Sequence, residues 1–252
     1  MKMNTMEILE GFDSITLGEM DAVKLLNRQD VKFVFHHNLL PEILEKLKIN
    51  YRVLSIEGNL FSQYETRYFD TPDLKMFIQH HNGKMNRHKV RFREYLDTGL
   101  TYFEIKFKTN KGRTIKDRVK LTDRNFTIQG ELENLLRKKT GFLPAMLQEA
   151  IHVRYNRITL VQKNLMERLT FDIELNYSKE GITEGFPELV IAEVKQDRSS
   201  RSPFTLIMQD HYISALSISK YCLGIACLAK NVKSNNFKPK LLHVKKLCNS
   251  NP

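Results

Sequence analysis

Charged and apolar residues alternate with a period of two along several segments in the middle of the chain. In the segment 89–93, Lys89, Arg91 and Arg93 are separated by single apolar residues. The same alternation runs through 103–108, 168–175 and 192–195. Because successive side chains of a β-strand point to opposite faces, each segment predicts a strand with one apolar face and one charged face.

The periodicity of the whole chain predicts an α+β protein. One or two short helices are expected within 1–27, where Thr16 and Glu19 have capping-box spacing. Further helices are expected over 38–47, over 74–80 and over 131–150 with a break at 141–144. Two more are expected to begin at Ser202 and near Ser219. Strands are expected over 30–35, 51–56, 63–69, 88–96, 101–108, 114–121, 153–161, 168–177 and 188–196. The strands 88–96 and 101–108 form an expected hairpin.

Length and charge favour one main domain. The chain has 252 residues, 41% of them hydrophobic, and no repeat or low-complexity linker divides it. The net charge is +11, but the six lysines beyond residue 229 have no acid among them and contribute +6 of it. We therefore expect an N-terminal helical segment, 1–27, a main domain, 28–229, and a mobile basic tail, 230–252.

The cysteines and the apolar runs indicate the compartment. Cys222, Cys227 and Cys248 lie near one end in odd number, which favours reduced thiols over disulfides, and they lack the ligand spacing of a zinc site. No N-terminal apolar run resembles a signal peptide, and no apolar run reaches the roughly 18 residues that span a bilayer. We expect a cytoplasmic protein.

The charged strand faces allow two interpretations. In the first, an antiparallel sheet buries its apolar face and turns its charged face to water. In the second, the sheet closes on itself, helices cover the apolar outside, and the cations point into a channel that holds a phosphate chain. The second interpretation accounts for like charges on neighbouring strands, which destabilise a sheet unless acids or a bound anion lie between them. The basic balance favours polyanionic partners.

Short motifs in a fixed order add to this pattern. They are Arg28-x-x-x-Lys32-Phe33, Tyr68-Phe69-Asp70, Lys89-Val90-Arg91-Phe92-Arg93, Phe103-Glu104-Ile105-Lys106, Lys116-x-Arg118, Tyr155-Asn156-Arg157, Arg168 with Asp172-x-Glu174, Glu193-Val194-Lys195 and Ser219-Lys220. In order and spacing they resemble the VTC domain family, the polyphosphate polymerase domain of vacuolar transporter chaperones and their bacterial relatives. That family lies within the triphosphate tunnel metalloenzyme (CYTH) superfamily, and the resemblance runs from about Arg28 to Lys220.

The resemblance implies a closed antiparallel β-tunnel of about eight strands with helices packed outside. It also implies an enzyme that moves the γ-phosphate of ATP onto a growing polyphosphate chain, with Mn²⁺ or Mg²⁺ as cofactor. By resemblance, the residues on the phosphates are Lys32, Arg91, Arg93, Lys106, Arg157, Arg168 and Lys220. Glu193 is implied as the metal ligand, and Tyr155, Lys116, Arg118 and Lys195 as further contacts to nucleotide or phosphate.

One motif departs from the wider superfamily. Its tunnel hydrolases begin with Glu-x-Glu-x-Lys, and here the same spacing reads Arg28-x-Asp30-x-Lys32. The loss of one acid disfavours two-metal triphosphate hydrolysis, which needs several carboxylates. Glu65 and Glu104 either share a metal or neutralise neighbouring cations, and we favour neutralisation.

Other short patterns favour structural interpretations. The doublets His36-His37 and His80-His81 have no carboxylate or cysteine at metal spacing, so we expect structural or exposed histidines. Gly83-Lys84 and Gly112-Arg113 resemble pieces of a phosphate loop without completing one, so we expect turns.

Three functions stay open at this point. The first is an ATP-dependent polyphosphate polymerase, the second is a tunnel triphosphatase or nucleotide cyclase, and the third is a non-catalytic module that binds polyphosphate, RNA or a membrane partner. Base stacking on RNA is disfavoured because Phe92, Phe103, Phe107 and Phe171 fall on the strand faces opposite the charges. The expected partners are ATP, polyphosphate and a separate membrane protein, with no specific nucleic acid, in the cytoplasm or at the inner face of a membrane.

Overall fold

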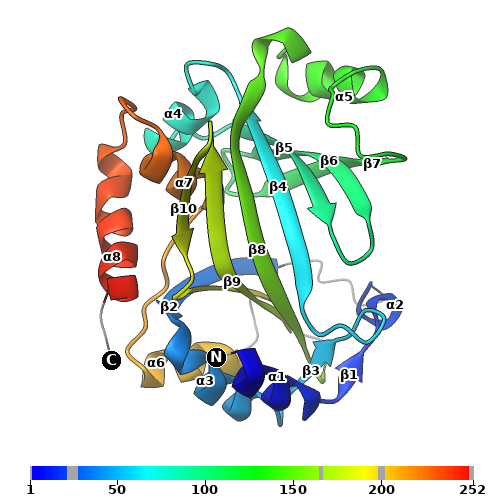
Figure 1. Ribbon diagram of the computed structural model, residues 1–252, viewed down its shortest axis with the longest axis vertical. Helices are drawn as coiled ribbons and strands as arrows, with labels where there is room; N and C mark the ends of the chain where they lie inside the picture. Colours follow the sequence, from blue (N-terminus) through cyan, green and yellow to red (C-terminus); the bar gives the residue numbers. More distant parts are fainter. Residues whose placement is uncertain (1, 22–27, 165–166, 198–201, 250–252) are drawn as a thin grey trace.

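An antiparallel sheet dominates the computed structural model, which describes all residues except 1, 22–27, 165–166, 198–201 and 250–252 (Figure 1). Its main path contains, in spatial order, β2 (Arg28–His36), β11 (Leu189–Asp197), β9 (Glu167–Lys179), β8 (Gln148–Gln162), β4 (Ser62–Asp70), β5 (Arg87–Tyr95), β6 (Leu100–Lys108) and β7 (Thr114–Leu121). Three shorter strands join it: β1 (Ser14–Ile15), β3 (Tyr51–Leu54) and β10 (Ile182–Phe186). All the predicted strands are present, with shifted ends.

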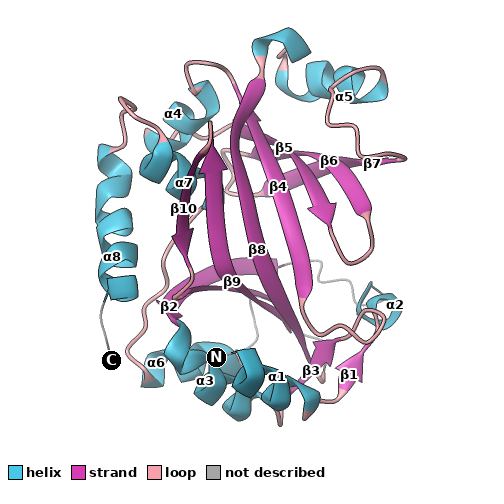
Figure 2. Ribbon diagram, in the orientation of Figure 1, coloured by secondary structure: helices cyan, strands magenta, loops and turns pink. Residues whose placement is uncertain are grey.

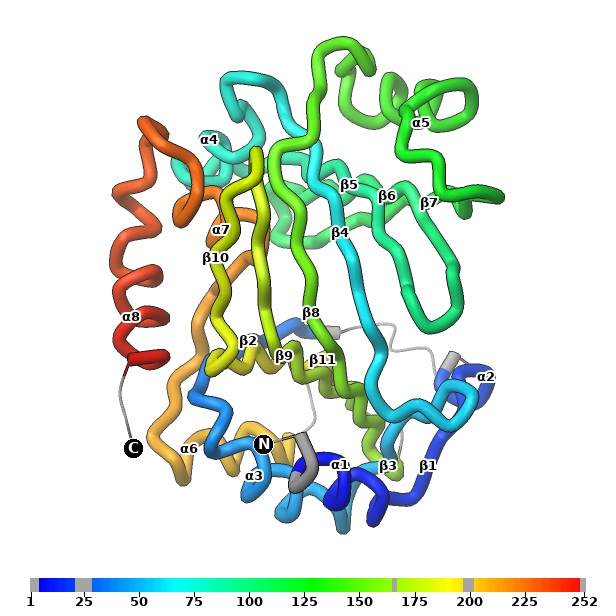
Figure 3. The backbone as a smooth tube through the Cα atoms, in the orientation of Figure 1, coloured from blue at the N-terminus to red at the C-terminus, as the bar shows by residue number. Residues whose placement is uncertain are grey.

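The sheet curls but does not close. Among the described residues, β2 and β7 end the path and do not pair with each other, so the closed tunnel expected from the resemblance is not confirmed. The curl is nevertheless strong. Lys106 on β6 and Glu193 on β11 lie close enough for their charges to interact, although four strands separate β6 from β11 along the sheet. In Figure 3, β5 to β7 and the pair β2 and β11 turn away behind β4 and β8.

Helices cover the apolar outside of the sheet, as predicted (Figure 2). Over β2, β8, β9 and β11 lie α1 (Lys2–Glu10), α3 (Leu40–Leu47) and α6 (Pro203–Asp210). Phe33 and Phe171 each meet the ring of Phe204 with 5.6 Å between centroids. No helix among the described residues is both long and apolar enough to cross a membrane.

Three more apolar clusters belong to the core of the described residues, the smallest of them formed by Ile15, Met20, Leu54 and Val161. The helix α5 (Glu131–Thr140) covers β5 and β6, where Phe92 and Phe103 are buried beside Leu136. A second cluster lies under α4 (Lys75–His81), α7 (Lys220–Leu228) and α8 (Lys238–Asn249). The remaining helical elements are α2 (Leu17–Asp21) and the short 3₁₀ turns η1 (His37–Leu39), η2 (Pro144–Met146) and η3 (Asn235–Phe237). Phe92, Phe103 and Phe171 therefore pack into the core, as predicted, whereas Phe107 is only partly buried and stacks on the ring of His88.

Side-chain caps fix the predicted helix starts. The Thr16 hydroxyl accepts a hydrogen bond from the Glu19 amide at 3.3 Å, and the Glu19 carboxylate accepts one from the Thr16 amide at 2.8 Å, so the capping box is present. Ser202 caps α6 and Ser219 caps α7. The latter cap places Lys220 as the first residue of α7, which matters for the site.

Several segments differ from the sequence prediction. Residues 148–150, expected in a helix, are the start of β8, and neither β1 nor β10 was predicted as a strand. The expected mobile tail contains α8, which packs against α7, β2 and β11 with Val244 fully buried. Its apolar residues Leu241, Val244, Leu247 and Cys248 follow helical spacing, and this stripe outweighs the lysines between them. The part of the predicted N-terminal helical segment that covers residues 22–27 lies outside the described residues.

Candidate functional site

The charged strand faces all point to the concave side of the curled sheet, which we call the inner face. Strand parity and register place there Lys32, Arg91, Arg93, Lys106, Lys116, Arg118, Tyr155, Arg157, Arg168, Glu193 and Lys195. Lys220 reaches it from the start of α7. The polar side of the sheet is thus folded inward rather than spread in water.

Glu104 is shared by two cations. Its side chain is fully buried, and it accepts a 2.8 Å hydrogen bond from Nε of Arg91 on the neighbouring strand. Nζ of Lys116 lies 3.2 Å away on the other side. The Tyr68 hydroxyl accepts from Arg91 at 3.2 Å. Burial raises the pKa of Glu104, but Arg91 and the other cations outweigh it, so the net pKa is lowered and the group stays ionised.

Asp172 is likewise shared by two cations, Arg157 and Lys220. Arg157 binds its two oxygens with two parallel hydrogen bonds of 2.6 and 2.9 Å, the forked geometry typical of arginine and carboxylate. Lys220 pairs with the same carboxylate from α7. The Asp172 side chain is 1% exposed, so it is held entirely by these cations.

Glu193 is the third shared carboxylate and the most accessible of the three. Nζ of Lys32 lies 3.4 Å from one oxygen and Nζ of Lys195 lies 3.1 Å from the other. Its side chain is 18% exposed, against 0% for Glu104 and 1% for Asp172. Burial raises the pKa of Glu193, but Lys32 and Lys195 outweigh burial and hold it well below the ordinary glutamate value.

Arg93 and Lys106 are inner-face cations with no carboxylate within ion-pair distance in the described part of the chain. Nε of Arg93 is buried and has no hydrogen-bond partner there, and its guanidinium lies 5.3 Å from the centre of the Tyr64 ring. The charge of Arg91 together with burial lowers the pKa of Lys106 well below the ordinary lysine value. Both groups are therefore candidates to bind an anion.

Stacked tyrosines support these cations. The rings of Tyr64 and Tyr155 lie parallel with 5.1 Å between centroids, and Arg157 lies within 5.5 Å of both centres. Nζ of Lys220 is 4.6 Å from the Tyr155 ring. The buried Tyr155 hydroxyl has no partner among the described residues, and burial raises its pKa, so it stays protonated and able to donate. The sequence prediction missed Tyr64, although it shares the inner-face parity of Tyr68.

Two further predicted site residues lie on the inner face, where the strand register pairs Arg118 with Glu104 and Arg168 with Lys195. A guanidinium nitrogen of Arg168 donates to the backbone oxygen of Met20 in α2 at 3.1 Å. The guanidinium of Arg118 lies 4.7 Å from the centre of the Tyr102 ring. The side chain of Arg28 lies outside the described residues.

The inner-face carboxylates suit a metal ion only if substrate phosphates supply the other ligands. Within the described ranges, no three His, Cys, Asp or Glu side chains form a metal-binding group. Glu65 lies on the outer side, 2.5 Å from Arg154 and 3.4 Å from His152, so it pairs structurally and does not share a site with Glu104. Magnesium is commonly bound by one or two carboxylates together with substrate phosphates. Glu193 fits that role because it is ionised and keeps an exposed edge.

The remaining histidine and glycine predictions agree with the structure. His36 and His37 stack on each other, and His81 bonds to Asn82 and Asn236, so these three histidines have structural contacts. Gly83 and Gly112 have positive φ angles of 68° and 76° in turns, where glycine is favoured.

Comparison with known proteins adds a family and a fold. A protein-family model described as VTC domain matches residues 27–229. A candidate adenylate cyclase from Bacillus halodurans is similar in structure, with a TM-score of 0.51, 16% identity, and coverage of 77% of this chain and 96% of that one. A candidate adenylyl cyclase from Hippeastrum, described as having a dominant triphosphatase activity, gives a TM-score of 0.50 at 11% identity, with 79% and 95% covered. At such identities these structures establish the fold alone. No curated protein matches the chain.

Proposed function

This chain belongs to the VTC domain family, and from that membership we propose that it is a polyphosphate polymerase that uses ATP. In this reaction a terminal oxygen of the polyphosphate chain attacks the γ-phosphorus of ATP. The bond between that phosphorus and the β,γ-bridging oxygen breaks, ADP leaves, and the chain grows by one phosphate. ATP and polyphosphate are accordingly the proposed ligands of the inner face.

The observation that carries this proposal is the sharing of each inner-face carboxylate by two cations. Every such group keeps a net positive charge, and Arg93 and Lys106 add two cations with no carboxylate of their own. Gathering like charges in a partly buried face is unfavourable unless an anion compensates them. A phosphate chain supplies that compensation along its whole length, whereas a single small anion does not.

The residues suit phosphoryl transfer because this reaction needs positioning and charge neutralisation more than a protein nucleophile. Arg91 and Arg157 are held by buried carboxylates, so they present their remaining donors in fixed directions. Lysines act as point charges that do not fix one phosphate register, which suits an anion that must slide after each addition. The Tyr155 hydroxyl is placed to donate to a phosphate oxygen.

Glu193 is the proposed ligand of a divalent metal, Mn²⁺ or Mg²⁺, with phosphate oxygens completing the coordination. When bound, such an ion neutralises charge on the transferring phosphate. Lys32 and Lys195 keep the Glu193 carboxylate ionised over the whole neutral pH range, so it is ready to bind a cation.

A tunnel triphosphatase is the second candidate, favoured by the activity described for the Hippeastrum protein. Two-metal hydrolysis needs several carboxylates free to bind metal. Here Glu104 and Asp172 are buried and saturated by cations, which supports the polymerase instead.

The test is direct. Purified protein is incubated with ATP and either Mn²⁺ or Mg²⁺, and polymer on a stained gel is followed beside ADP and free phosphate. Polymer with matching ADP supports the proposal. Free phosphate without polymer would establish the triphosphatase, and polyphosphate binding without turnover would establish a binding module. Arg93→Ala is expected to abolish polymer formation, whereas Arg113→Ala, in the exposed β6–β7 turn, serves as the matched control.

A further inference from the structure

Three lysines from three different elements converge on the three residues that lead into α7, Ser217, Ile218 and Ser219. Nζ of Lys240 in α8 donates to the Ser217 backbone oxygen at 2.5 Å. Nζ of Lys32 in β2 donates to the Ile218 oxygen at 3.3 Å, and Nζ of Lys89 in β5 donates to the Ser219 hydroxyl at 2.8 Å. Because consecutive Cα atoms are only about 3.8 Å apart, the three ammonium groups are gathered in a short span.

Neutral oxygens hold the ammonium groups of Lys89 and Lys240, so no acid compensates the charge of these two lysines. Within the described part of the chain, neither Lys89 nor Lys240 has a carboxylate within ion-pair distance, and Lys32 shares Glu193 with Lys195. A fourth cation nearby, Arg87, donates to the backbone oxygen of Lys84 at 2.7 Å. Such a cluster creates a strong positive potential, because the like charges that converge here outnumber the acids beside them.

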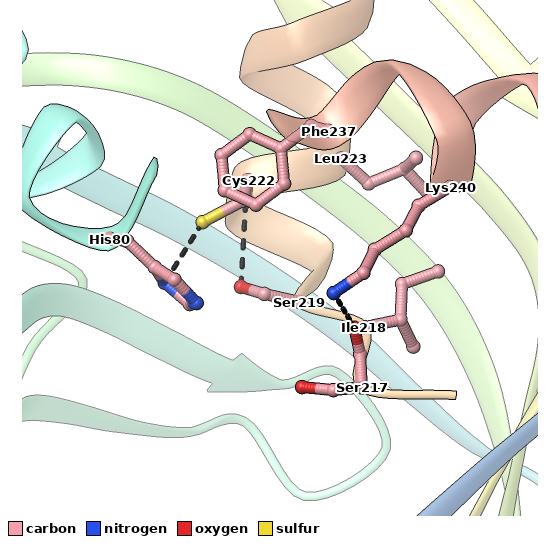
Figure 4. A pocket seen from close by; sticks show the side chains of 8 residues that line it. All are labelled: His80, Ser217, Ile218, Ser219, Cys222, Leu223, Phe237 and Lys240. Carbon is pink, nitrogen blue, oxygen red and sulfur yellow. Dashed lines mark hydrogen bonds between the residues drawn. The ribbon is translucent and has the colours of Figure 1, made fainter. Parts of the chain in front are cut away.

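The wall between these cations is neutral. Nδ1 of His80 lies 3.1 Å from Sγ of Cys222, and both line a small pocket with Ser219 and Lys240 (Figure 4). Burial, followed by the charges of Lys89 and its neighbours, lowers the pKa of His80 to about 2, so the imidazole is uncharged at neutral pH. Burial raises the pKa of the Cys222 thiol, which keeps it protonated. Neither group cancels the positive charge around it.

This cluster is continuous with the inner face. Lys32 contacts both Glu193 and the Ile218 oxygen, and Lys220, the next residue after Ser219, pairs with Asp172. An anion that leaves the centre of the inner face along this side therefore meets Lys89 and Lys240 next. We propose that Lys89, Lys240 and Arg87 form a mouth of the inner face that binds the part of a polyphosphate chain extending beyond the catalytic centre.

This inference rests on the proposed function and adds three residues to its binding site. One of them, Lys240, lies in the segment 230–252, which the sequence predicted to be a mobile tail. A phosphate chain fits the mouth better than RNA does, because none of the described residues that line the pocket has a ring free to stack a base. Phe237, the aromatic residue lining the pocket, packs its ring against Phe77 at 5.4 Å and against His80 at 5.8 Å. The role of α8 is then to carry Lys240 to the mouth.

Chain length separates a mouth contact from a contact in the centre. A short anion such as inorganic triphosphate is bound by the centre alone, whereas a long polyphosphate also reaches the mouth. Binding of both ligands is measured for the full chain, for Lys240→Glu and for Lys245→Glu. The last variant makes the same charge change on an exposed residue of the same helix, near Cys227 and away from the mouth.

We expect Lys240→Glu to weaken binding of long polyphosphate by roughly tenfold, as for the loss of one charge-assisted contact, and to leave triphosphate binding unchanged. Lys245→Glu should bind both ligands like the unmodified chain. Equal long-chain affinity in all three proteins would overturn the mouth, and so would an equal loss in both variants, since that would reflect overall surface charge. An unmodified chain that binds neither ligand would instead overturn the proposed function. Arg87→Ala is a second mouth variant, used if Lys240→Glu does not fold.

Discussion

The inner-face cations are of two kinds, and substitution should distinguish them. Arg91 is 5% exposed and neutralises a carboxylate that is itself fully buried, whereas Arg93 leaves no carboxylate behind when it is removed. A residue of the first kind contributes to folding and to ligand binding together. A residue of the second kind contributes mainly to ligand binding, because only a weak contact with Tyr64 is lost with it.

Arg91→Ala should therefore lower the free energy of unfolding by about 3 kcal/mol, since removing one partner of a buried ion pair leaves an uncompensated charge and Lys116 replaces only part of it. Arg93→Ala should change it by no more than about 1 kcal/mol. Both should weaken triphosphate binding. Urea unfolding of the two variants measures the contrast, and equal losses of stability would contradict the division of the inner face into two kinds of cation.

His80 provides a pH prediction. Its folded-state pKa is lowered to about 2, from an unfolded value near 6.5, so below about pH 6.5 the unfolded chain binds a proton that the folded chain does not. Stability should therefore fall as pH falls through this window, by up to about 1.4 kcal/mol per pH unit from this group. The groups that face it are Lys89, Arg87, Lys240, Lys32 and Cys222.

The measurement is urea unfolding at pH 7.5 and pH 5 for the unmodified chain, for His80→Gln and for His243→Gln, an exposed histidine of α8. His80→Gln should lose less stability on acidification than the other two proteins. Parallel losses in all three would show that the imidazole titrates normally in the folded state.

At the scale of elements, α7 is positioned by close packing at Gly224. A Cβ atom added there would collide with the ring of Tyr177 and with the Cδ1 atom of Ile151. Helix propensity alone favours alanine over glycine by up to about 1 kcal/mol. Overpacking a tight core position costs about 1–3 kcal/mol, so packing decides whether alanine at position 224 stabilises or destabilises the protein.

Gly224→Ala should accordingly lower the free energy of unfolding by roughly 1–2 kcal/mol and, because α7 begins at Lys220, should also weaken phosphate binding. Gly18→Ala is the control, since Gly18 lies in α2 with no atom within 4 Å of the added carbon. Thermal unfolding followed by circular dichroism compares the two variants. A stabilised Gly224→Ala protein would show that α7 has room to move.

The elements also show what the sequence can predict. Alternation fixed the parity of the inner strands, so Arg91, Arg93 and Lys106 lie on the face expected for them. The same rule applied to 62–68 would have added Tyr64, which carries no charge to attract notice. The helix α8 was missed because its apolar stripe is interrupted by lysines, and β10 because a five-residue hairpin arm is specified mainly by the turn at Glu180 and Gly181, both with positive φ.

At the scale of the whole molecule, the sheet is curled and open between β2 and β7. Closure depends on pairing between strands that are distant in sequence, and strand alternation contains no information about that register. The curl still brings Lys106 on one arm toward Lys32 and Glu193 on the other. A bound phosphate chain would therefore connect the two arms through their cations, which no described backbone hydrogen bond between β2 and β7 does.

Polyanion binding should for this reason stabilise the fold, and Lys106 should carry much of the effect. At a ligand concentration 100 times Kd, mass action raises the free energy of unfolding by about 2.7 kcal/mol. Lys106→Met should unfold at an equal or higher temperature without ligand, because Arg91 and burial both disfavour the charged lysine. If the substitution weakens binding tenfold, the same ligand concentration should add only about 1.4 kcal/mol.

Thermal unfolding with triphosphate and with sodium chloride at matched ionic strength measures both the stability without ligand and the stabilisation by ligand. Lys111→Met in the exposed β6–β7 turn is the control. Equal ligand stabilisation in the two variants would place the anion away from Lys106 and so away from the inner face.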